Sequence, residues 1–262
     1  ITIYGGDIAI NAALSATYGA SPTPALSDVN LHASGAVTQT AAITAAGLGL
    51  HGTGTFTLAN VANSVNTLAG GNSTSRLGSL TFVNANALTI GTVNPTGITA
   101  SGDVFVATVS GDLTVSADVT TDSTGSSAIV LAAGTSAGSG GDGTPSAGNV
   151  LVVNNPAFAV GSGGTMAVYS GSVAGSTGLT TAVGSGSGHF RYNTSISHLG
   201  VVSAGHTTAL ATDALTALYR EQPSISGTIA DQTILYGESP EDATLSGGSG
   251  LVNGDGLDAV IN

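Results

Sequence analysis

The sequence predicts an all-β protein, a right-handed parallel β-helix (a β-solenoid) with a small C-terminal β module. One phrase recurs: a small residue, then Asp or Asn, then a short run in which apolar residues alternate with small or polar ones. It occurs at 6–10, 27–31, 102–106, 111–115 and 148–152. Gly with Asp or Asn favours a turn in which the Asp or Asn side chain bonds its own backbone, and alternation is the period of a half-buried strand. A corner and a short strand, repeated many times, are typical of a solenoid.

The composition excludes several classes of function. The chain has 262 residues, of which 41% are apolar, and this is too apolar for a disordered protein. With three Arg, no Lys and a net charge of −12, it lacks the clustered cations that nucleic acids and anionic membranes attract. No apolar run approaches the roughly 18 residues that span a bilayer. The absence of Cys excludes disulfides, thiol catalysis and Cys–zinc sites.

The spacing of the short strands predicts coils. Two strands flank a corner at 5–7, and a Pro-containing loop follows at 18–27. Further strands are expected at 29–31, 36–40, 43–44, 55–58, 80–82, 88–90, 104–106, 113–115 and 129–131. Three strands per coil of roughly 20–25 residues would stack with about 4.8 Å between coils. Val, Ile, Leu and Ala are then expected to face inward, and Thr, Ser and Asn to face outward or to form columns along the axis.

Three regions are expected: a shaft at 1–200, a connector at 201–223 and an incomplete β module at 224–262. Within the shaft, the Gly- and Ser-rich stretch at 134–148 is interpreted as a loop. The less periodic stretch at 165–198 is interpreted as the last coils beneath a loop cover.

The connector is expected to contain a short helix at 207–220. Leu210, Ala214, Leu215 and Leu218 would lie on one side of it. The chain opens at Ile1 without a signal peptide, which predicts a processed product or a piece of one.

Two stretches resemble known families. The segments GTGTFTLANVANSVNTLAG, LTFVNANALTIGTV, GITASGDV and MAVYSGS resemble the shaft of filamentous-haemagglutinin-type adhesins. These are exoproteins of Gram-negative bacteria, exported by two-partner secretion, with right-handed β-helix shafts. Residues 218–257 are similar to the opening of the MBG-type (mostly β, glycine-rich) repeat, with Tyr236, Pro240 and Asn253 in the expected order. An MBG-type module is about twice as long as 224–262, and the family's amino-terminal secretion domain is missing.

The predicted stack is expected to expose strand edges at its open end, and the C-terminal segment to expose strands that lack partners. Such edges seek pairing. The candidate interaction residues are Ile1 and Ile3 at the open end of the coils and Ile225, Ile229, Ile234 and Tyr236 in the C-terminal segment. Either the chain is a piece of a much longer protein, or its bare ends pair between copies and form a fibre.

No pattern indicates a catalytic or metal centre, and no cofactor is expected. The five His residues lack helical i, i+4 spacing, and the cluster at 189–192 is interpreted as a cap over the last coil. Asp103 and Asp112 could lie on one face, but turn formation explains both. Calcium could bind at 140–143 or at 253–256, but neither stretch has the repeated nonapeptide signature of calcium β-rolls.

The expected function is therefore a structural or adhesive segment of a secreted, Gram-negative cell-surface protein, not an enzyme. Its expected partners are copies of itself, neighbouring modules of a longer chain, and a host or neighbouring cell surface. The alternative is a carbohydrate- or ice-binding β-helix, or, with less support, a carbohydrate-cleaving one. A strict Thr-x-Thr array and a row of aromatic residues would favour that alternative, and the sequence shows neither.

Overall fold

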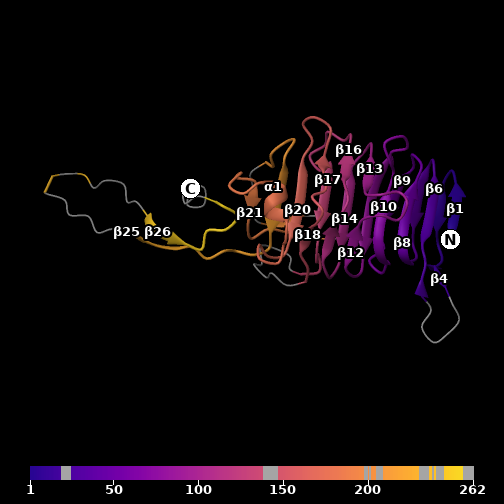
Figure 1. Cartoon of the computed structure of the whole chain (residues 1–262), viewed down its shortest axis with the longest axis horizontal. Coiled ribbons are helices and arrows are strands. Elements are labelled where there is room, and N and C mark those ends of the chain that lie inside the picture. Colours follow the sequence, from indigo (N-terminus) through magenta and orange to yellow (C-terminus); the bar gives the residue numbers. More distant parts are fainter. Residues whose placement is uncertain are drawn as a thin grey trace.

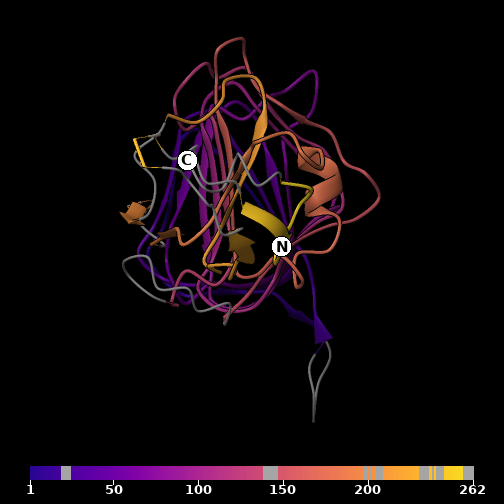
Figure 2. The same ribbon diagram turned by 90° about the vertical axis from the view of Figure 1, so that its left-hand side faces the viewer.

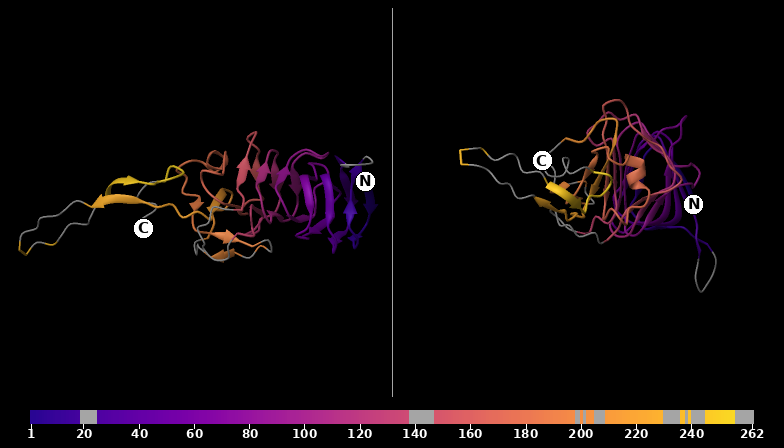
Figure 3. Two further views of the ribbon diagram at one scale, coloured as in Figure 1. Left: turned by 90° about the horizontal axis from the view of Figure 1, so that it is seen from below. Right: turned by 60° about the vertical axis from the view of Figure 1, so that its left-hand side comes forward.

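The computed structural model is a parallel β-helix with a short antiparallel ribbon beyond its C-terminal end (Figure 1). It describes residues 1–18, 25–137, 147–197, 200, 202–204, 209–229, 236–237, 239 and 245–255. Viewed along the axis, the coils superimpose in one closed outline (Figure 2). The ribbon continues away from the shaft along its length (Figure 3). The predicted all-β parallel solenoid is confirmed.

Two parallel sheets run along the axis. Sheet A has eleven strands: β1 (Thr2–Gly5), β3 (Leu14–Ser15), β6 (Val29–Ala33), β8 (Ile43–His51), β10 (Ser64–Gly70), β12 (Leu88–Ile90), β13 (Ile98–Ala100), β15 (Leu113–Val115), β16 (Val119–Thr121), β18 (Val150–Val152) and β19 (Phe158–Ala159). Sheet B has nine: β2 (Ile8–Ile10), β7 (Ala36–Gln39), β9 (Thr55–Leu58), β11 (Ser79–Asn84), β14 (Val104–Thr108), β17 (Ile129–Ala132), β20 (Met166–Ser170), β21 (Phe190–Arg191) and β24 (Leu215–Tyr219).

Three short antiparallel pairs lie outside the two sheets within the described residues. They are β4 (Thr17–Tyr18) with β5 (Ala25–Leu26), β22 (Ser195–Ile196) with β23 (Val202–Ala204), and β25 (Ser226–Ile229) with β26 (Leu245–Ser249). The described residues contain one helix, α1 (Leu179–Val183).

Equivalent positions recur once per coil. Leu80 pairs with Val104, and Val104 pairs with Ile129, so these coils are 24 and 25 residues long. This agrees with the predicted length. Ile129 pairs with Met166, 37 residues further on, because the later coils carry insertions.

The core consists of aliphatic columns parallel to the axis. One column in sheet A contains Val29, Leu48, Leu68, Ile90, Val115 and Val152. One in sheet B contains Ile8, Val37, Phe56, Leu80, Val104, Ile129, Met166 and Leu215. No member is more than 8% exposed. Because parallel coils place matching positions above one another, side chains of similar size fill the interior continuously.

The outer face of sheet B changes from polar to apolar along the axis. One outward column runs through Thr38, Thr57, Thr81, Phe105, Val130 and Ala167. Where it becomes apolar, Ile196 of β22 and Leu210 pack against it. The predicted loop cover therefore includes a segment that lies against the side of the shaft, and the apolar outward residues are explained by this cover.

Two buried Asn side chains connect successive coils at the corners. Asn84 is fully buried, and its amide exchanges two hydrogen bonds with the backbone of Val65, accepting at 2.9 Å and donating at 3.0 Å. Asn63 accepts from the N–H of Ile43 at 2.8 Å and donates to the carbonyl of Val83 at 3.0 Å. An amide carries both donors and acceptors, so each Asn satisfies backbone groups that the turning chain leaves unpaired.

Corner carboxylates also connect coils. The Oδ1 atom of Asp7 accepts the N–H of Ala36 at 2.7 Å, and that of Asp112 accepts the N–H of Asn149 at 2.8 Å. Asn149 in turn accepts the N–H of Ser172 at 2.8 Å. The prediction that these side chains bond their own turn is therefore wrong at these corners, because each acceptor serves a neighbouring coil instead.

The prediction of a helix at 207–220 is wrong, because this range contains the strand β24, which lies in sheet B between β20 and β21. Leu215, Ala217 and Tyr219 belong to the core, while Leu218 joins the apolar cluster on the outer face. A strand that is buried on both faces lacks polar alternation, so its sequence imitates the apolar stripe of a helix. The shaft consequently includes β24, which lies within the predicted connector 201–223.

Replacing Asn84 with Ala should lower the free energy of unfolding by about 2–4 kcal/mol, since the backbone N–H and C=O of Val65 would remain buried without partners. A urea titration followed by circular dichroism measures this. Asn86→Ala, an exposed side chain on the same turn, is the control and should change stability by less than about 0.5 kcal/mol. Equal effects of the two substitutions would contradict the role of Asn84.

Gly71→Ala should destabilise the shaft by at least about 2 kcal/mol. Gly71 has a φ of 66°, and a Cβ atom there would lie 2.1 Å from the carbonyl oxygen of Thr99. Gly6→Ala is the matched control because no atom lies within 4 Å of its Cβ position. The thermal unfolding midpoints of the two variants test this, and a Gly71 variant as stable as the Gly6 variant would be inconsistent with it.

Candidate functional site

The N-terminal end of the shaft presents strand edges. Among the described residues, β1 pairs only with β6 and β2 pairs only with β7. Ile1 is 50% exposed, and Ile3 is half-buried against the end of the core. These two predicted interaction residues therefore lie together at the outer edge of sheet A, where the amine and carbonyl of Ile1 already bond to Asp28 and Asn30.

A column of rings runs along the outer face of sheet A from this end. Tyr4, His32 and His51 occupy paired positions on β1, β6 and β8. Their ring centroids lie 4.4 and 4.1 Å apart, and the two imidazole planes differ by 4°. Burial, and then the neighbouring His32, lower the pKa of His51 below its ordinary value of 6.5. Sequence spacing alone could not reveal this relation, because it depends on the register of three coils.

The C-terminal end of the shaft is closed by aromatic and cationic side chains. Tyr219 is fully buried and stacks on Tyr192 with centroids 5.8 Å apart. The guanidinium of Arg220, only 3% exposed, donates to the carbonyls of Ala133 and Gly148 at 2.6 Å each. Burial raises the pKa of Tyr219 to about 12 and lowers that of Arg220 to about 10, so neither group changes charge near neutral pH.

A hydrogen-bond network joins this closed end to the segment that follows β26. The hydroxyl of Tyr192 donates to Oδ2 of Asp255 at 2.5 Å, and Nδ2 of Asn253 donates to the Tyr192 oxygen at 3.0 Å. Thr180 of α1 donates to Oδ1 of Asn253 at 2.5 Å. Burial, and then the bond to Asp255, raise the pKa of Tyr192 above its ordinary value of 10. The network keeps Tyr192 protonated and holds Asp255 in place.

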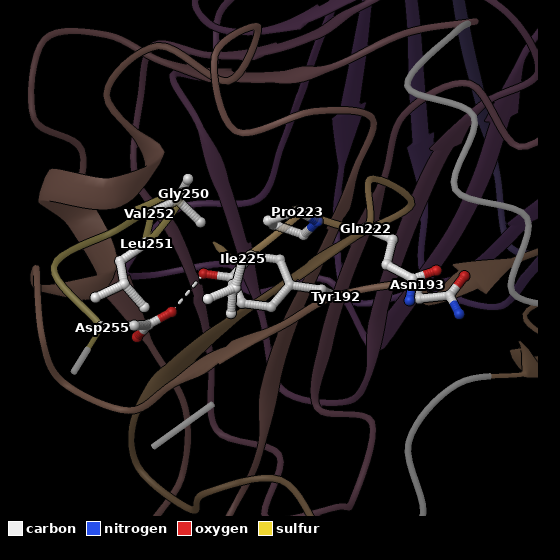
Figure 4. Close-up of a pocket in the computed structure, with 9 residues that line it drawn as sticks. All are labelled: Tyr192, Asn193, Gln222, Pro223, Ile225, Gly250, Leu251, Val252 and Asp255. Carbon is white, nitrogen blue, oxygen red and sulfur yellow. Dashed lines mark hydrogen bonds between the residues drawn. The ribbon is translucent and has the colours of Figure 1, made fainter. Parts of the chain in front are cut away.

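A pocket of about 310 Å³ lies beside this network (Figure 4). Asn193 and Gln222 come to one end of it and Asp255 to the other, with the ring of Tyr192 between them. Its apolar lining includes Ile225. The pocket combines a carboxylate, two amides and an apolar wall, which is the composition of a small-molecule site.

The predicted C-terminal interaction residues are dispersed. Ile225 lines the pocket, and Ile229 pairs with Leu245 of β26 in the same chain. Tyr236 is fully exposed, and Ile234 lies outside the described residues. The expectation that the C-terminal strands lack partners is therefore wrong for β25 and β26.

The side chains considered for catalysis and metal binding make contacts within the fold. Asp103 accepts a hydrogen bond from the hydroxyl of Ser123 at 2.5 Å, and Asp112 accepts one from the next coil. Asn253 and Asp255, in the second calcium candidate, belong to the Tyr192 network, and the first candidate, 140–143, lies outside the described residues. In the part of the chain that the structure describes, no three His, Asp or Glu side chains gather as metal ligands.

Comparison with known proteins yields no relative: no family model, curated protein or solved structure matches the chain. Within the described ranges, no helix has the length and apolar character that crossing a membrane requires. The function is accordingly inferred from the geometry of the shaft and of its two ends.

The first coils should lose stability as the pH falls below about 6.5. The pKa of His51 is lowered in the folded protein, so the unfolded chain binds more protons in this window and protonation favours unfolding. Amide exchange of β1 and β6, corrected for intrinsic rates and compared at about pH 7.5 and pH 5, measures this.

One variant within this ring column and one outside it isolate the cause. His51→Phe keeps a ring in the column but cannot titrate, and it should abolish most of the acid dependence. His189→Phe, outside the column, should leave it unchanged. Acid dependence that persists unchanged in His51→Phe would contradict this assignment.

Proposed function

We propose that the chain is a stiff structural segment of an extracellular bacterial adhesin or fibre. The observation that carries this proposal is the uninterrupted stack of coils, whose aliphatic columns continue from β2 to β24. Sheet B alone has nine strands, which at about 4.8 Å per step corresponds to about 38 Å of shaft. A dry core combined with hydrogen bonds along the axis resists bending and local opening.

The use of polar residues supports a structural role. Corner Asp and Asn side chains bind neighbouring coils, and Arg220 is buried against backbone carbonyls. Arg76 forms an ion pair with Asp122 at 3.3 Å. With three Arg and no Lys in the sequence, the shaft offers little positive charge to nucleic acid or an anionic membrane.

The resemblance to the shaft of filamentous-haemagglutinin-type adhesins supports the same proposal, and it also suggests where the protein is located. Its segments coincide with regular coils, since the longest quoted stretch contains β9 and β10. The proposed location is therefore the surface of a Gram-negative cell, after secretion. The proposed partners are neighbouring modules or copies and a host or neighbouring cell surface.

End-to-end contact is proposed through the edge of β1 and β2. The C-terminal ribbon has its own internal pairing, so the N-terminal edge is the better-supported half of such a contact. An edge strand with Ile1 half exposed invites another strand. Ice binding is less favoured, because the outward Thr column of sheet B contains only Thr38, Thr57 and Thr81 before it becomes apolar.

Electron microscopy of the purified protein, combined with light scattering, tests this function. Straight rods are expected, with end-joined rods increasing with concentration. Ile3→Lys should reduce end-joining, because it places a charge at the strand edge, whereas Val61→Lys on an exposed turn should not. Compact globular particles would contradict the shaft, and single rods at every concentration would contradict end-joining.

A further inference from the structure

The sequence contains two Asn-x-Ser/Thr motifs whose middle residue is not Pro, at 72–74 and at 193–195. In this motif the amide nitrogen of the Asn side chain can accept a sugar. A third stretch, 94–96, has the excluded Pro in the middle. Because a chain rich in Asn, Ser and Thr also contains such motifs by chance, the surroundings of each Asn must show whether it can react.

The first motif lies on an exposed turn between β10 and β11. Backbone hydrogen bonds of 3.0 and 3.2 Å between Asn72 and Ser75 close this turn. Asn72, Ser73 and Thr74 are all exposed. The turn belongs to neither of the two sheets, so a bulky group attached to it would leave the register of the coils unchanged.

The residues that follow Asn72 hold its side-chain amide in place. Its Oδ1 atom accepts the hydroxyl of Thr74 at 2.8 Å and the N–H groups of Thr74 and Ser75 at 2.9 Å each. Three donors stabilise negative charge on this oxygen, which makes it easier for the nitrogen of the same amide to lose a proton. Among the described residues, the Nδ2 atom of Asn72 has no hydrogen-bond partner, and it lies on the opposite side of Cγ from these donors.

The second motif lacks all of these features. Thr194 and Ser195 are 0% and 1% exposed. Within the described residues, Oδ1 of Asn193 and the hydroxyl of Ser195 are both buried without a partner, so the hydroxyl does not bond to the amide. Ser195 also begins the strand β22 and does not follow Asn193 in a turn. The folded chain therefore presents the first motif to solvent and encloses the second.

From these contacts we propose that Asn72 is an N-glycosylation site of the folded protein, modified by a transferase that uses a sugar activated as a pyrophosphate ester. Nδ2 of Asn72 forms a bond to the anomeric carbon, and the bond from that carbon to the pyrophosphate oxygen breaks. The pyrophosphate leaves with the bonding electrons, and a base of the transferase takes the amide proton. Thr74 is a positioning residue, because its hydroxyl holds the amide. This inference depends neither on end-joining nor on an adhesive role.

Transfer of sugar to the purified, intact chain tests the proposal with two donors. One is UDP-glucose with a soluble N-glucosyltransferase, and the other is a lipid-pyrophosphate-linked oligosaccharide with an oligosaccharyltransferase. With at least one of them, mass spectrometry should show the gain of a single glycan, and peptide mapping should place it on Asn72. The donor that reacts identifies the source of the sugar.

Variants of the turn separate the role of Thr74 from that of Asn72. Asn72→Gln should abolish transfer. Thr74→Val should slow it by at least about tenfold, because the hydroxyl that holds the amide is lost, whereas Thr74→Ser should retain most of the rate.

Ser195→Ala is the control, since it removes the second motif and replaces a buried hydroxyl that has no partner among the described residues. It should leave the amount of transferred sugar unchanged. The proposal is overturned if neither donor modifies Asn72, or if Asn193 is modified as extensively as Asn72 in the folded chain. Equal rates for Thr74→Val and Thr74→Ser would also overturn it.

Discussion

The structure depends on the register between successive coils. In a parallel stack, each inward position must meet the same kind of position one coil further on, because a slip of one residue would turn the whole aliphatic column outward. The sheet B column maintains this from Ile8 to Leu215, even where 37 residues separate Ile129 from Met166. Insertions are tolerated because they leave the coil at its corners and return in register.

Corners are where this arrangement is most demanding, because a turning backbone cannot satisfy all its polar groups with ladder hydrogen bonds. The chain uses short side chains there, and each of them reaches a neighbouring coil along the axis. Asp7, Asn63, Asn84, Asp112 and Asn149 all make such bonds. Although the chain is acidic, these carboxylates are parts of the scaffold, which weakens any argument from acidic residues to catalysis.

The repeated corner-and-strand phrase was sufficient to predict the solenoid and the length of its central coils, since both follow from local turn chemistry and period-two alternation. Contacts between coils could not be predicted from the sequence in the same way. The sequence of β24 resembles a helix because its outer face is covered by residues distant in the chain. Likewise, the ring column of Tyr4, His32 and His51 and the pocket around Tyr192 join residues that only the completed register brings together.

The two ends of the shaft differ in a way that bears on function. In a solenoid each coil contacts only its neighbours, so a terminal coil lacks half of its stabilising contacts. At the C-terminal end, Tyr219, Arg220 and α1 supply those contacts, and this same closure creates the pocket. At the N-terminal end, β1 and β2 retain open edges within the described residues. The edges of β1 and β2 are therefore the part of the described shaft that could accept another strand.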